Sequence, residues 1–293
     1  MVSSQETTLG YRCVKTRKKK SFPMQMAYNA RVFSSGGVRG IAHFGALHVM
    51  HQLHAEKIEN VSHFLGTSAG AIAAFAAIHR QMSSEQFFRT KIRPFEYNTH
   101  VFQKSRNESL HTFVDHICPK DLTFESLFNQ TGQTLCVIGS NLTRKQTVIF
   151  DHIRTPKMTV NLALKISCAV PILFPTIRCE RTGDILLDGA LTNAFPIDIA
   201  REEYGCERIL GFKFSMEKFD ESDEQFKFLS FLGSLIDTFI NKEYQPGGGT
   251  DICLIECGTI SSLRFSLSTD EKDQLFELGA RSCMTFFDQK KVE

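Results

Sequence analysis

The stretch Phe64-Leu-Gly-Thr-Ser-Ala-Gly-Ala-Ile-Ala-Ala-Phe-Ala-Ala-Ile78 is the feature that most constrains how this chain folds. A short apolar run at residues 61–65 leads into it, as an interior strand would, and an alanine-rich run typical of a helix leads out. Ser68 stands at the change between the two, with Gly66 and Gly70 two positions away on either side. A turn this tight is strained and leaves no room for neighbouring side chains, which favours glycine on both flanks. The pattern therefore predicts a strand–turn–helix unit with the Ser68 hydroxyl exposed at its tip.

The same G-x-S-x-G pattern is that of a nucleophile elbow, in which the first N–H groups of the following helix point toward the serine hydroxyl. The plainer interpretation is a glycine–serine connection between a strand and a helix, with no chemistry. A serine hydroxyl is a weak nucleophile at neutral pH and needs a base. The choice between the two interpretations therefore depends on partners elsewhere in the chain.

The order of the expected elements indicates an α/β protein. Residues 30–34 are expected to form a first strand, followed by a helix from Ile41 to about Lys57, the strand at 61–65 and a helix from Ala69. Strand, helix, strand and helix in so short a span predict a parallel pair of strands in an α/β sheet.

Further elements are expected along the rest of the chain, and residues 81–130 are mainly polar with helical patches. These elements are strands at 135–140, 146–150, 185–187 and 209–214, a helix at 159–169, and a last helix from about Thr269 that opens with the capping box Ser268-x-x-Glu271. The strands at 135–140 and 146–150 are expected to form a hairpin. A phenylalanine- and leucine-rich stripe at helical spacing over residues 223–244 favours a core helix, with a lipid-facing helix as the alternative.

The histidines do not fit the triad order of α/β-hydrolases, in which the catalytic histidine follows the acid near the C-terminus. All ten histidines lie at or before His152, so none follows the candidate acids of the second half. A triad built from His116 or His152 stays open as an alternative.

A carboxylate acting directly on the serine is the other solution, and Asp188 is the candidate of the right type. It follows the short apolar strand at 185–187, as Ser68 follows its own strand. In a parallel sheet both residues would emerge at the same carboxyl edge, where α/β proteins bind ligands. Gly189 and Ala190 leave room around the carboxylate, although Asp-Gly is also an ordinary turn sequence.

The run Ser35-Gly-Gly-Val-Arg-Gly40 follows the first strand and opens a helix. Consecutive glycines let backbone N–H groups approach a ligand closely, as an oxyanion hole requires. The run is neither a dinucleotide fingerprint nor a Walker A loop, because the glycines and the lysine of those motifs are missing. Arg39 is expected either to anchor this loop or hold an anionic head group, or to form a structural ion pair.

Taken in order, the three motifs resemble those of the patatin-like phospholipase family, which carries a G-G-G-x-[RK]-G loop, a G-x-S-x-G elbow and Asp-Gly-[GA]. Further matching pieces are Ser167-Cys-Ala-Val-Pro171, Phe174-Pro175, Asn193 and Pro196. The resemblance covers about residues 30–215. One departure is Ser35, which replaces the first glycine of the loop, but the donors that the family implies are the next residues, Gly36 and Gly37, so the oxyanion hole is expected to survive.

The resemblance implies a three-layer α/β/α sandwich with a mainly parallel central sheet, and a lipid acyl hydrolase of phospholipase A or lysophospholipase type. The alternative is a catalytically idle lipid-binding or scaffold protein that kept the fold. The implied site consists of the nucleophile Ser68, the general base Asp188, oxyanion-hole amides at Gly36 and Gly37 with a contribution from Ala69, the loop or anion-anchoring residues Arg39 and Gly40, and the elbow glycines Gly66 and Gly70.

No metal or cofactor is expected for this chemistry. Histidines 43, 48, 51 and 54 fall on one expected helix, but no pair among them has the i, i+4 spacing of helical metal ligands. The implied partners are a lipid or phospholipid substrate and a membrane surface that the enzyme contacts transiently.

Composition narrows the remaining choices. The net charge of +2 gives no overall case for binding nucleic acid, and 42% hydrophobic residues suit a soluble protein with a large core. Residues 1–27 are expected to be a disordered tail, with a basic cluster at 12–20 whose alternative roles are attraction to anionic lipid or a nuclear address. Residues 28–293 are expected to form one domain.

The expected location is cytoplasmic, and possible contact with membranes is peripheral. No apolar run approaches the roughly 20 residues that span a bilayer, and the N-terminus lacks the apolar segment of a signal peptide. The nine cysteines are scattered, which indicates reduced, mostly buried thiols rather than disulfides.

Overall fold

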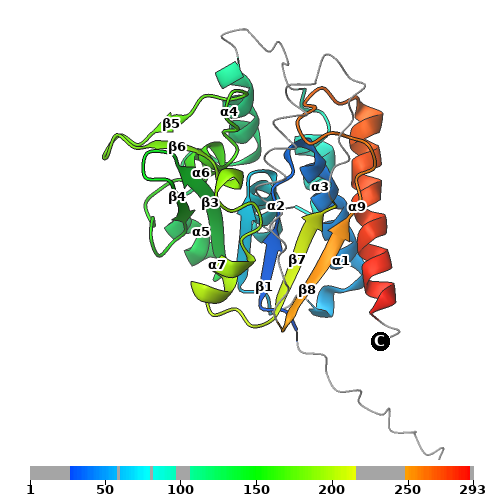
Figure 1. Ribbon diagram of the computed structural model, residues 1–293. Coiled ribbons are helices and arrows are strands. Elements are labelled where there is room, and N and C mark those ends of the chain that lie inside the picture. The colour runs from blue at the N-terminus through cyan, green and yellow to red at the C-terminus, as the bar shows by residue number, and fades with distance from the viewer. Residues whose placement is uncertain (1–26, 58–59, 80–81, 97–105, 216–247, 291–293) are drawn as a thin grey trace, which may run out of the picture.

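The computed structural model describes residues 27–57, 60–79, 82–96, 106–215 and 248–290, and its centre is a single sheet of eight strands (Figure 1). The strands are β1 (Ala30–Phe33), β2 (His63–Thr67), β3 (Thr134–Asn141), β4 (Gln146–Phe150), β5 (Ile177–Arg178), β6 (Ile185–Asp188), β7 (Ile209–Phe214) and β8 (Thr250–Ile255). Their order across the sheet is β5-β6-β3-β2-β1-β7-β8, and β4 pairs with β3 beside this path.

The core of the sheet is parallel, as the sequence predicts. Strands β3, β2, β1, β7 and β8 pair parallel with one another in that order. Strands β4, β5 and β6 pair antiparallel, on the side of the sheet where β3 lies. Helices cover both faces, which confirms the expected three-layer fold with a mainly parallel sheet (Figure 1).

The two faces of the sheet carry different helices. The helices are α1 (Ile41–Leu53), α2 (Ala69–Ile78), α3 (Ser84–Phe87), α4 (Arg106–Ile117), α5 (Phe124–Thr131), α6 (Val160–Ser167), α7 (Ile197–Glu202) and α9 (Thr269–Gln289). The larger core joins one face of the sheet to α1, α2, α4, α5, α6 and α9. A smaller core joins the other face to α7, because alternate strand residues such as Val32 and Ile138 point to that side.

Helix α2 packs against the middle of the sheet with mostly small residues. It contacts β1, β2 and β3, and every residue from Gly70 to Ile78 is buried. Six alanines among its ten residues favour the helix and let it lie against the strands with few bulky side chains between them. The start of α2, directly after β2, is therefore held firmly in place.

Most expected elements are confirmed, with shifted ends. The hairpin of β3 and β4, the strand at 209–214 and the capping box between Ser268 and Glu271 appear as predicted. The first long helix ends at Leu53 rather than near Lys57, and a separate 3-10 turn follows at Ala55–Lys57.

Some expectations fall on residues that the structure does not describe. The basic tail at 1–26 and the phenylalanine-rich stripe at 223–244 lie outside the described residues, so both stay predictions. None of the helices in the described ranges is both long and apolar enough to cross a membrane.

Candidate active site

The elbow at Ser68 has the strained backbone that its sequence predicts. Ser68 joins β2 to α2 with φ 55° and ψ −125°, a region that residues with side chains rarely adopt. A Cβ at Gly66 would lie 2.2 Å from the carbonyl oxygen of Gly70, and a Cβ at Gly70 would lie 2.4 Å from that of Phe33. Both flanking positions are therefore restricted to glycine by the backbone around them.

Asp188 reaches Ser68 by a route that the sequence analysis did not predict. The expectation that its strand runs parallel to β2 is wrong, because β6 pairs antiparallel with β3. Residues Val137 and Ile138 of β3 pair with both β2 and β4, and the next residues pair with both β4 and β6. A strand has two edges, so β2 and β6 share one edge of β3 and meet there end to end.

The register of this end-to-end meeting brings the two side chains together. Thr67, the last residue of β2, pairs with Ile138, and Asp188, the last residue of β6, pairs with Gly139. The Ser68 hydroxyl donates a hydrogen bond of 2.7 Å to Oδ2 of Asp188. The carboxyl edge of the parallel core was thus the right place to expect both residues, although the strand direction was wrong.

The expectation that Ser68 lies on an exposed tip is also wrong. The residue is only 5% exposed, and Asp188 is only 2% exposed. Both line a pocket with segments from far along the chain, including the loop at 35–39, Val170-Pro171 and Ser262-Leu263. These segments close around the elbow, and a motif within one short stretch gives no sign of them.

Burial controls the electrostatics of the carboxylate. Loss of solvation raises the pKa of Asp188 to about 7, although the backbone N–H of Ala190 and the Ser68 hydroxyl oppose the rise. The Ala190 N–H donates to Oδ1 at 2.8 Å, so each carboxylate oxygen has one donor. A carboxylate with a pKa near neutrality is suited to taking up and releasing a proton under physiological conditions.

Two glycines of the loop after β1, Gly36 and Gly37, line the pocket. Within the described chain, no protein acceptor is bonded to the N–H of Gly36 or Gly37, whereas the next amide, that of Val38, donates to the carbonyl of Ser262 at 2.9 Å. Gly37 has φ +53°, and a Cβ there would lie 2.0 Å from the Ser262 oxygen. At Ser35, the departure from the family pattern, the N–H donates to the carbonyl of Ala194 at 2.8 Å.

The two remaining loop residues occupy different positions. Arg39 is buried, lines the same pocket, and stacks its guanidinium 5.6 Å from the ring centre of Phe214. Its Nη1 donates to the carbonyl of Ser215 at 3.4 Å. Gly40 instead lies against the start of α2, because a Cβ there would lie 2.4 Å from the Cβ of Ala69.

The histidines that the structure describes lie outside the lining of the pocket that holds Ser68. His116 lies near Phe95, and His152 stacks on Phe128 with a centroid distance of 3.8 Å. The four histidines of the first helix are also separated: His48 faces Glu85, whereas the ring of His54 packs on Phe287.

Comparison with known proteins agrees with the motifs and with this geometry. The sequence model of the family described as patatin-like phospholipase matches residues 32–201, which is more than half of the chain. The chain belongs to the patatin-like phospholipase family. The match includes the glycine-rich loop, the elbow and Asp188.

One relative is the protein named "Probable lipid hydrolase 463L" of Invertebrate iridescent virus 6. It is 30% identical over 190 residues, which cover 59% of this chain and 63% of that protein. The matched region thus spans less than two thirds of that relative.

Solved structures share the patatin-like fold at low identity. VipD from Legionella pneumophila superposes with a TM-score of 0.57 at 15% identity, over 89% of this chain and 67% of that one. Human GIVD cytosolic phospholipase A2, in complex with a fluorophosphonate, gives a TM-score of 0.55 at 12% identity, over 92% and 60% of the two chains.

The patatin-like site also contains residues that the sequence analysis did not assign. Ser167 accepts the Ser68 N–H at 2.8 Å and donates to the carbonyl of Ile138 at 2.5 Å, and so ties the elbow to β3. The Cys168 thiol lies beside the Ser68 hydroxyl, and burial, together with the Asp188 carboxylate, raises its pKa well above 9.0. The stretch Ser167–Pro171 was noticed as a family motif, but no pattern in it indicates these contacts.

His43 is another residue that the motifs leave without a role. It is fully buried, and its Nε2–H donates to the carbonyl of Ser34 at 3.0 Å, just before the glycine-rich loop. Burial lowers the pKa of His43 to about 4, so the ring stays neutral. Its ring packs between the rings of Phe33 and Phe214, and this packing and the hydrogen bond to Ser34 hold the start of the loop in place.

Proposed function

We propose that this chain is a lipid acyl hydrolase of phospholipase A or lysophospholipase type, which cleaves carboxylic esters through Ser68 and Asp188. The observation that carries the proposal is the 2.7 Å hydrogen bond from Ser68 to Asp188, in a pocket also lined by Gly36 and Gly37, whose amides donate to no protein acceptor among the described residues. Family membership and the viral lipid hydrolase relative support the same class of substrate.

In the first half of the proposed reaction, Ser68 Oγ attacks the ester carbonyl carbon while Asp188 accepts the hydroxyl proton. The negative charge that develops on the carbonyl oxygen is held by the N–H groups of Gly36 and Gly37, with Ala69 N–H at the start of α2 as a third donor. Collapse of the tetrahedral intermediate expels the alcohol, which takes the proton from Asp188. An acyl-enzyme ester on Ser68 remains.

In the second half, Asp188 accepts a proton from water, whose oxygen attacks the acyl carbon. The intermediate breaks the bond to Ser68 Oγ, Asp188 returns the proton to that oxygen, and a fatty acid leaves. Cys168 does not take over as nucleophile, because its raised pKa keeps it a neutral thiol.

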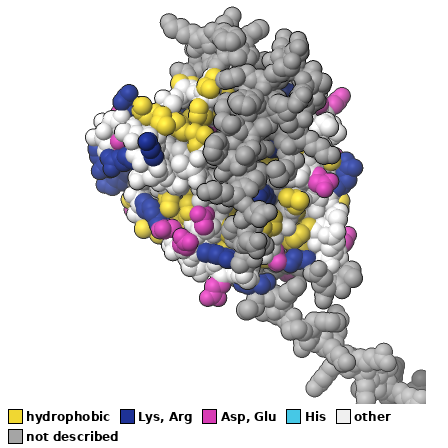
Figure 2. Space-filling model, in the orientation of Figure 1, with side chains coloured by type: hydrophobic (Ala, Val, Ile, Leu, Met, Phe, Trp, Pro, Cys, Tyr) yellow, Lys and Arg dark blue, Asp and Glu magenta, His cyan; other side chains and the backbone are white. Residues whose placement is uncertain are grey.

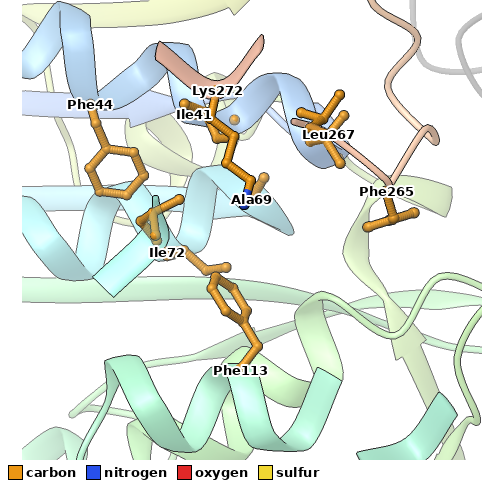
Figure 3. Close-up of a pocket in the computed structure, with 12 residues that line it drawn as sticks. Ile41, Phe44, Ala69, Ile72, Phe113, Phe265, Leu267 and Lys272 are labelled. Atoms are coloured by element: carbon orange, nitrogen blue, oxygen red, sulfur yellow. The ribbon is translucent and has the colours of Figure 1, made fainter. Parts of the chain in front are cut away.

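A second pocket next to the proposed oxyanion hole suits the acyl chain. It shares Gly37 with the first pocket and reaches Ala69. Figure 3 shows Phe44 and Ile72 on one side of it and Leu267 on the other. Since its lining is almost wholly apolar, an acyl chain extending from a carbonyl at Ser68 would be shielded from water there.

Arg39 places a cation on the wall of the pocket that holds Ser68. We assign it to the alcohol side of the substrate, where it would meet an anionic head group, while the acyl chain lies on the other side of the loop. This arrangement favours phospholipids and lysophospholipids over neutral glycerides.

The proposed base predicts an acidic limb in the pH–rate profile. Asp188 must be ionised to accept a proton, and its pKa is raised to about 7. We therefore expect kcat/KM on a soluble short-chain ester to fall about tenfold per pH unit below pH 7. A profile that is flat from pH 5 to 8, or whose inflection moves in His116→Asn or His152→Asn, would point to another base.

Gly37→Ala tests the proposed oxyanion hole. The new Cβ would meet the Ser262 oxygen and turn the Gly37 amide away, so we expect kcat to fall about 10²-fold. The matched control is Gly132→Ala, because Gly132 has φ +66° with nothing within 4 Å of its Cβ position. The control should lose about 1 kcal/mol of stability and keep its kcat. Equal kcat values for the two variants would show that the Gly37 amide is not part of the oxyanion hole.

The whole proposal is tested by release of fatty acid from a panel of phospholipids, lysophospholipids, triacylglycerols and acyl-CoA. We expect release from phospholipid or lysophospholipid that disappears in Ser68→Ala. Binding of these lipids by wild-type protein without any release would support the idle lipid-binding protein instead.

A further inference from the structure

The turn at residues 170–174 holds an exposed apolar side chain next to two residues that line the pocket of Ser68. Ile172 has φ 73° and is 60% exposed. For a β-branched residue a positive φ is a genuine outlier, and such strain persists only where the surroundings impose it. Its neighbour Pro171 lines the pocket that contains Ser68.

The residues on either side of Ile172 fix this turn. Val170 and Leu173 are buried against Leu263, and the N–H of Phe174 donates to the carbonyl of Val170 at 2.8 Å across the turn. Because both ends are anchored, the conformation of Ile172 follows from the packing. An asparagine or glycine would fit this backbone better, yet the position presents isoleucine to solvent.

A second exposed apolar residue lies at the same pocket. Leu191 is 42% exposed and lines the pocket beside Ala190. Ile172 directly follows the lining residue Pro171, and we call these two exposed residues, Ile172 and Leu191, the apolar rim. The upper end of the molecule, toward which β7 and β8 point in Figure 1, carries grouped apolar side chains in Figure 2.

Cations extend the apolar rim on one side. Strand β6 enters from beyond the carboxyl end of β3, so the turn of the β5–β6 hairpin and the turn between β3 and β4 lie at this same end. These turns and β5 carry Lys145, Arg178 and Arg181 against Glu180, while Arg144 forms an ion pair with Asp184 at 2.8 Å. Lys and Arg side chains gather beside the apolar ones at the upper left of Figure 2.

We propose that the apolar rim, together with these hairpin cations, docks the protein on an anionic lipid surface with the pocket mouth facing the lipid. The isoleucine and leucine would enter the interfacial layer, while the arginines and lysine would meet the anionic head groups. The excess of positive over negative side chains on the two hairpins is the charge complementarity that selects this partner. The proposal rests on the lipid acyl hydrolase function proposed above, since it explains how a buried serine reaches an ester in an aggregate.

Ile172→Asn separates docking from stability. Asparagine tolerates a positive φ, so we expect the melting temperature to stay equal or rise. Loss of the apolar side chain should weaken co-sedimentation with phosphatidylserine–phosphatidylcholine vesicles roughly tenfold. Binding is measured in the Ser68→Ala background, so that the vesicles are not consumed. With Ser68 intact, Ile172→Asn should hydrolyse a soluble short-chain ester like wild type and vesicle phospholipid about tenfold more slowly.

Ile153→Asn is the matched control. Ile153 is 63% exposed but follows β4, which runs toward the opposite end of β3, so its replacement should leave vesicle binding unchanged. Arg181→Gln should weaken binding to the anionic vesicles and leave binding to pure phosphatidylcholine vesicles as it is. Equal weakening by Ile153→Asn and Ile172→Asn would overturn the proposal, because binding would then not depend on the rim.

Other outcomes would refute one of the two proposals, docking or lipid hydrolysis, without refuting the other. Vesicle binding that is weakened by Ile172→Asn in a protein that hydrolyses no lipid would support docking and refute the function. Hydrolysis that is unaffected by Ile172→Asn, on vesicles as on soluble ester, would refute docking and leave the function standing. Self-association of wild type that Ile172→Asn abolishes, with vesicle binding unchanged, would assign the apolar rim to a second copy of the chain and overturn the proposal.

Discussion

Ser68→Ala is expected to lower the rate of ester hydrolysis by a factor on the order of 10⁴ or more, while the protein stays folded. The hydroxyl donates its hydrogen bond to Asp188 inside the pocket, and Ser167 and β3 hold the backbone of the elbow without it. Initial rates on a soluble ester, with the melting temperature as a folding control, measure the effect. Turnover by folded Ser68→Ala comparable to that of wild type would exclude Ser68 as the nucleophile.

Ser68→Gly is the companion variant, because it removes the hydroxyl and also the backbone strain. At φ 55° and ψ −125° glycine is favoured over alanine, so Ser68→Gly should be more stable than Ser68→Ala by about 1 kcal/mol. Both variants should be equally inactive. If Ser68→Ala were inactive but Ser68→Gly were active, the loss of activity in Ser68→Ala would come from the altered elbow and not from the missing hydroxyl.

Asp188→Asn is expected to lower kcat by about 10³-fold or more, since the proposed base is lost while the shape of the side chain is kept. The two residues act as one unit in the proposed mechanism, so the double variant with Ser68→Ala should be little worse than either single variant. Replacement of His116 or His152 should have no comparable effect. A larger loss in a histidine variant than in Asp188→Asn would favour a triad over the dyad.

The same substitution should change how stability depends on pH. Burial raises the pKa of Asp188 from 3.8 to about 7, so the folded protein binds this proton more tightly than the unfolded chain does. The stabilisation is complete below about pH 4 and is lost as the pH rises through 7. Asparagine does not titrate, so Asp188→Asn should gain roughly 3 kcal/mol relative to wild type between pH 5 and pH 8.

Denaturant unfolding of both proteins at pH 5 and pH 8 measures this difference. A constant difference between the two proteins would mean that the Asp188 carboxylate titrates near its ordinary pKa. Ionisation of Asp188 thus costs wild type stability, relative to its own value at low pH, at the pH where wild type is most active. Such a trade of stability for function is common at catalytic sites.

The sequence predicts the parallel core well because each of its elements is encoded locally. The glycines at 66 and 70, the alanines of α2 and the capping box at Ser268 act within a few residues, so their patterns can be read directly. The direction of β6 cannot be read in the same way. Its four residues fit a parallel or an antiparallel partner equally, and pairing with the end of β3 decides the direction.

In the candidate site, too, the features encoded by local sequence are predicted and those set by long-range packing are not. Ser68, Asp188 and the glycine-rich loop are recognisable because each motif is short and the three occur in order. The burial of Ser68 involves Pro171, Ser262 and Leu263, which lie far along the chain, and no local pattern indicates that they close around the elbow. The supporting contacts of Ser167 and the strained turn at Ile172 likewise depend on packing that no local pattern encodes.

The most direct test of the proposed dyad is the mass of the intact protein after reaction with a long-chain alkyl fluorophosphonate, followed by peptide mapping. The proposal predicts one adduct, on Ser68, that forms rapidly in wild type, slowly in Asp188→Asn and not at all in Ser68→Ala. The rate of labelling should rise with pH through about 7, as Asp188 ionises. An adduct on another residue, or labelling of wild type and Asp188→Asn at the same rate, would contradict the assignment of Ser68 as nucleophile and Asp188 as its base.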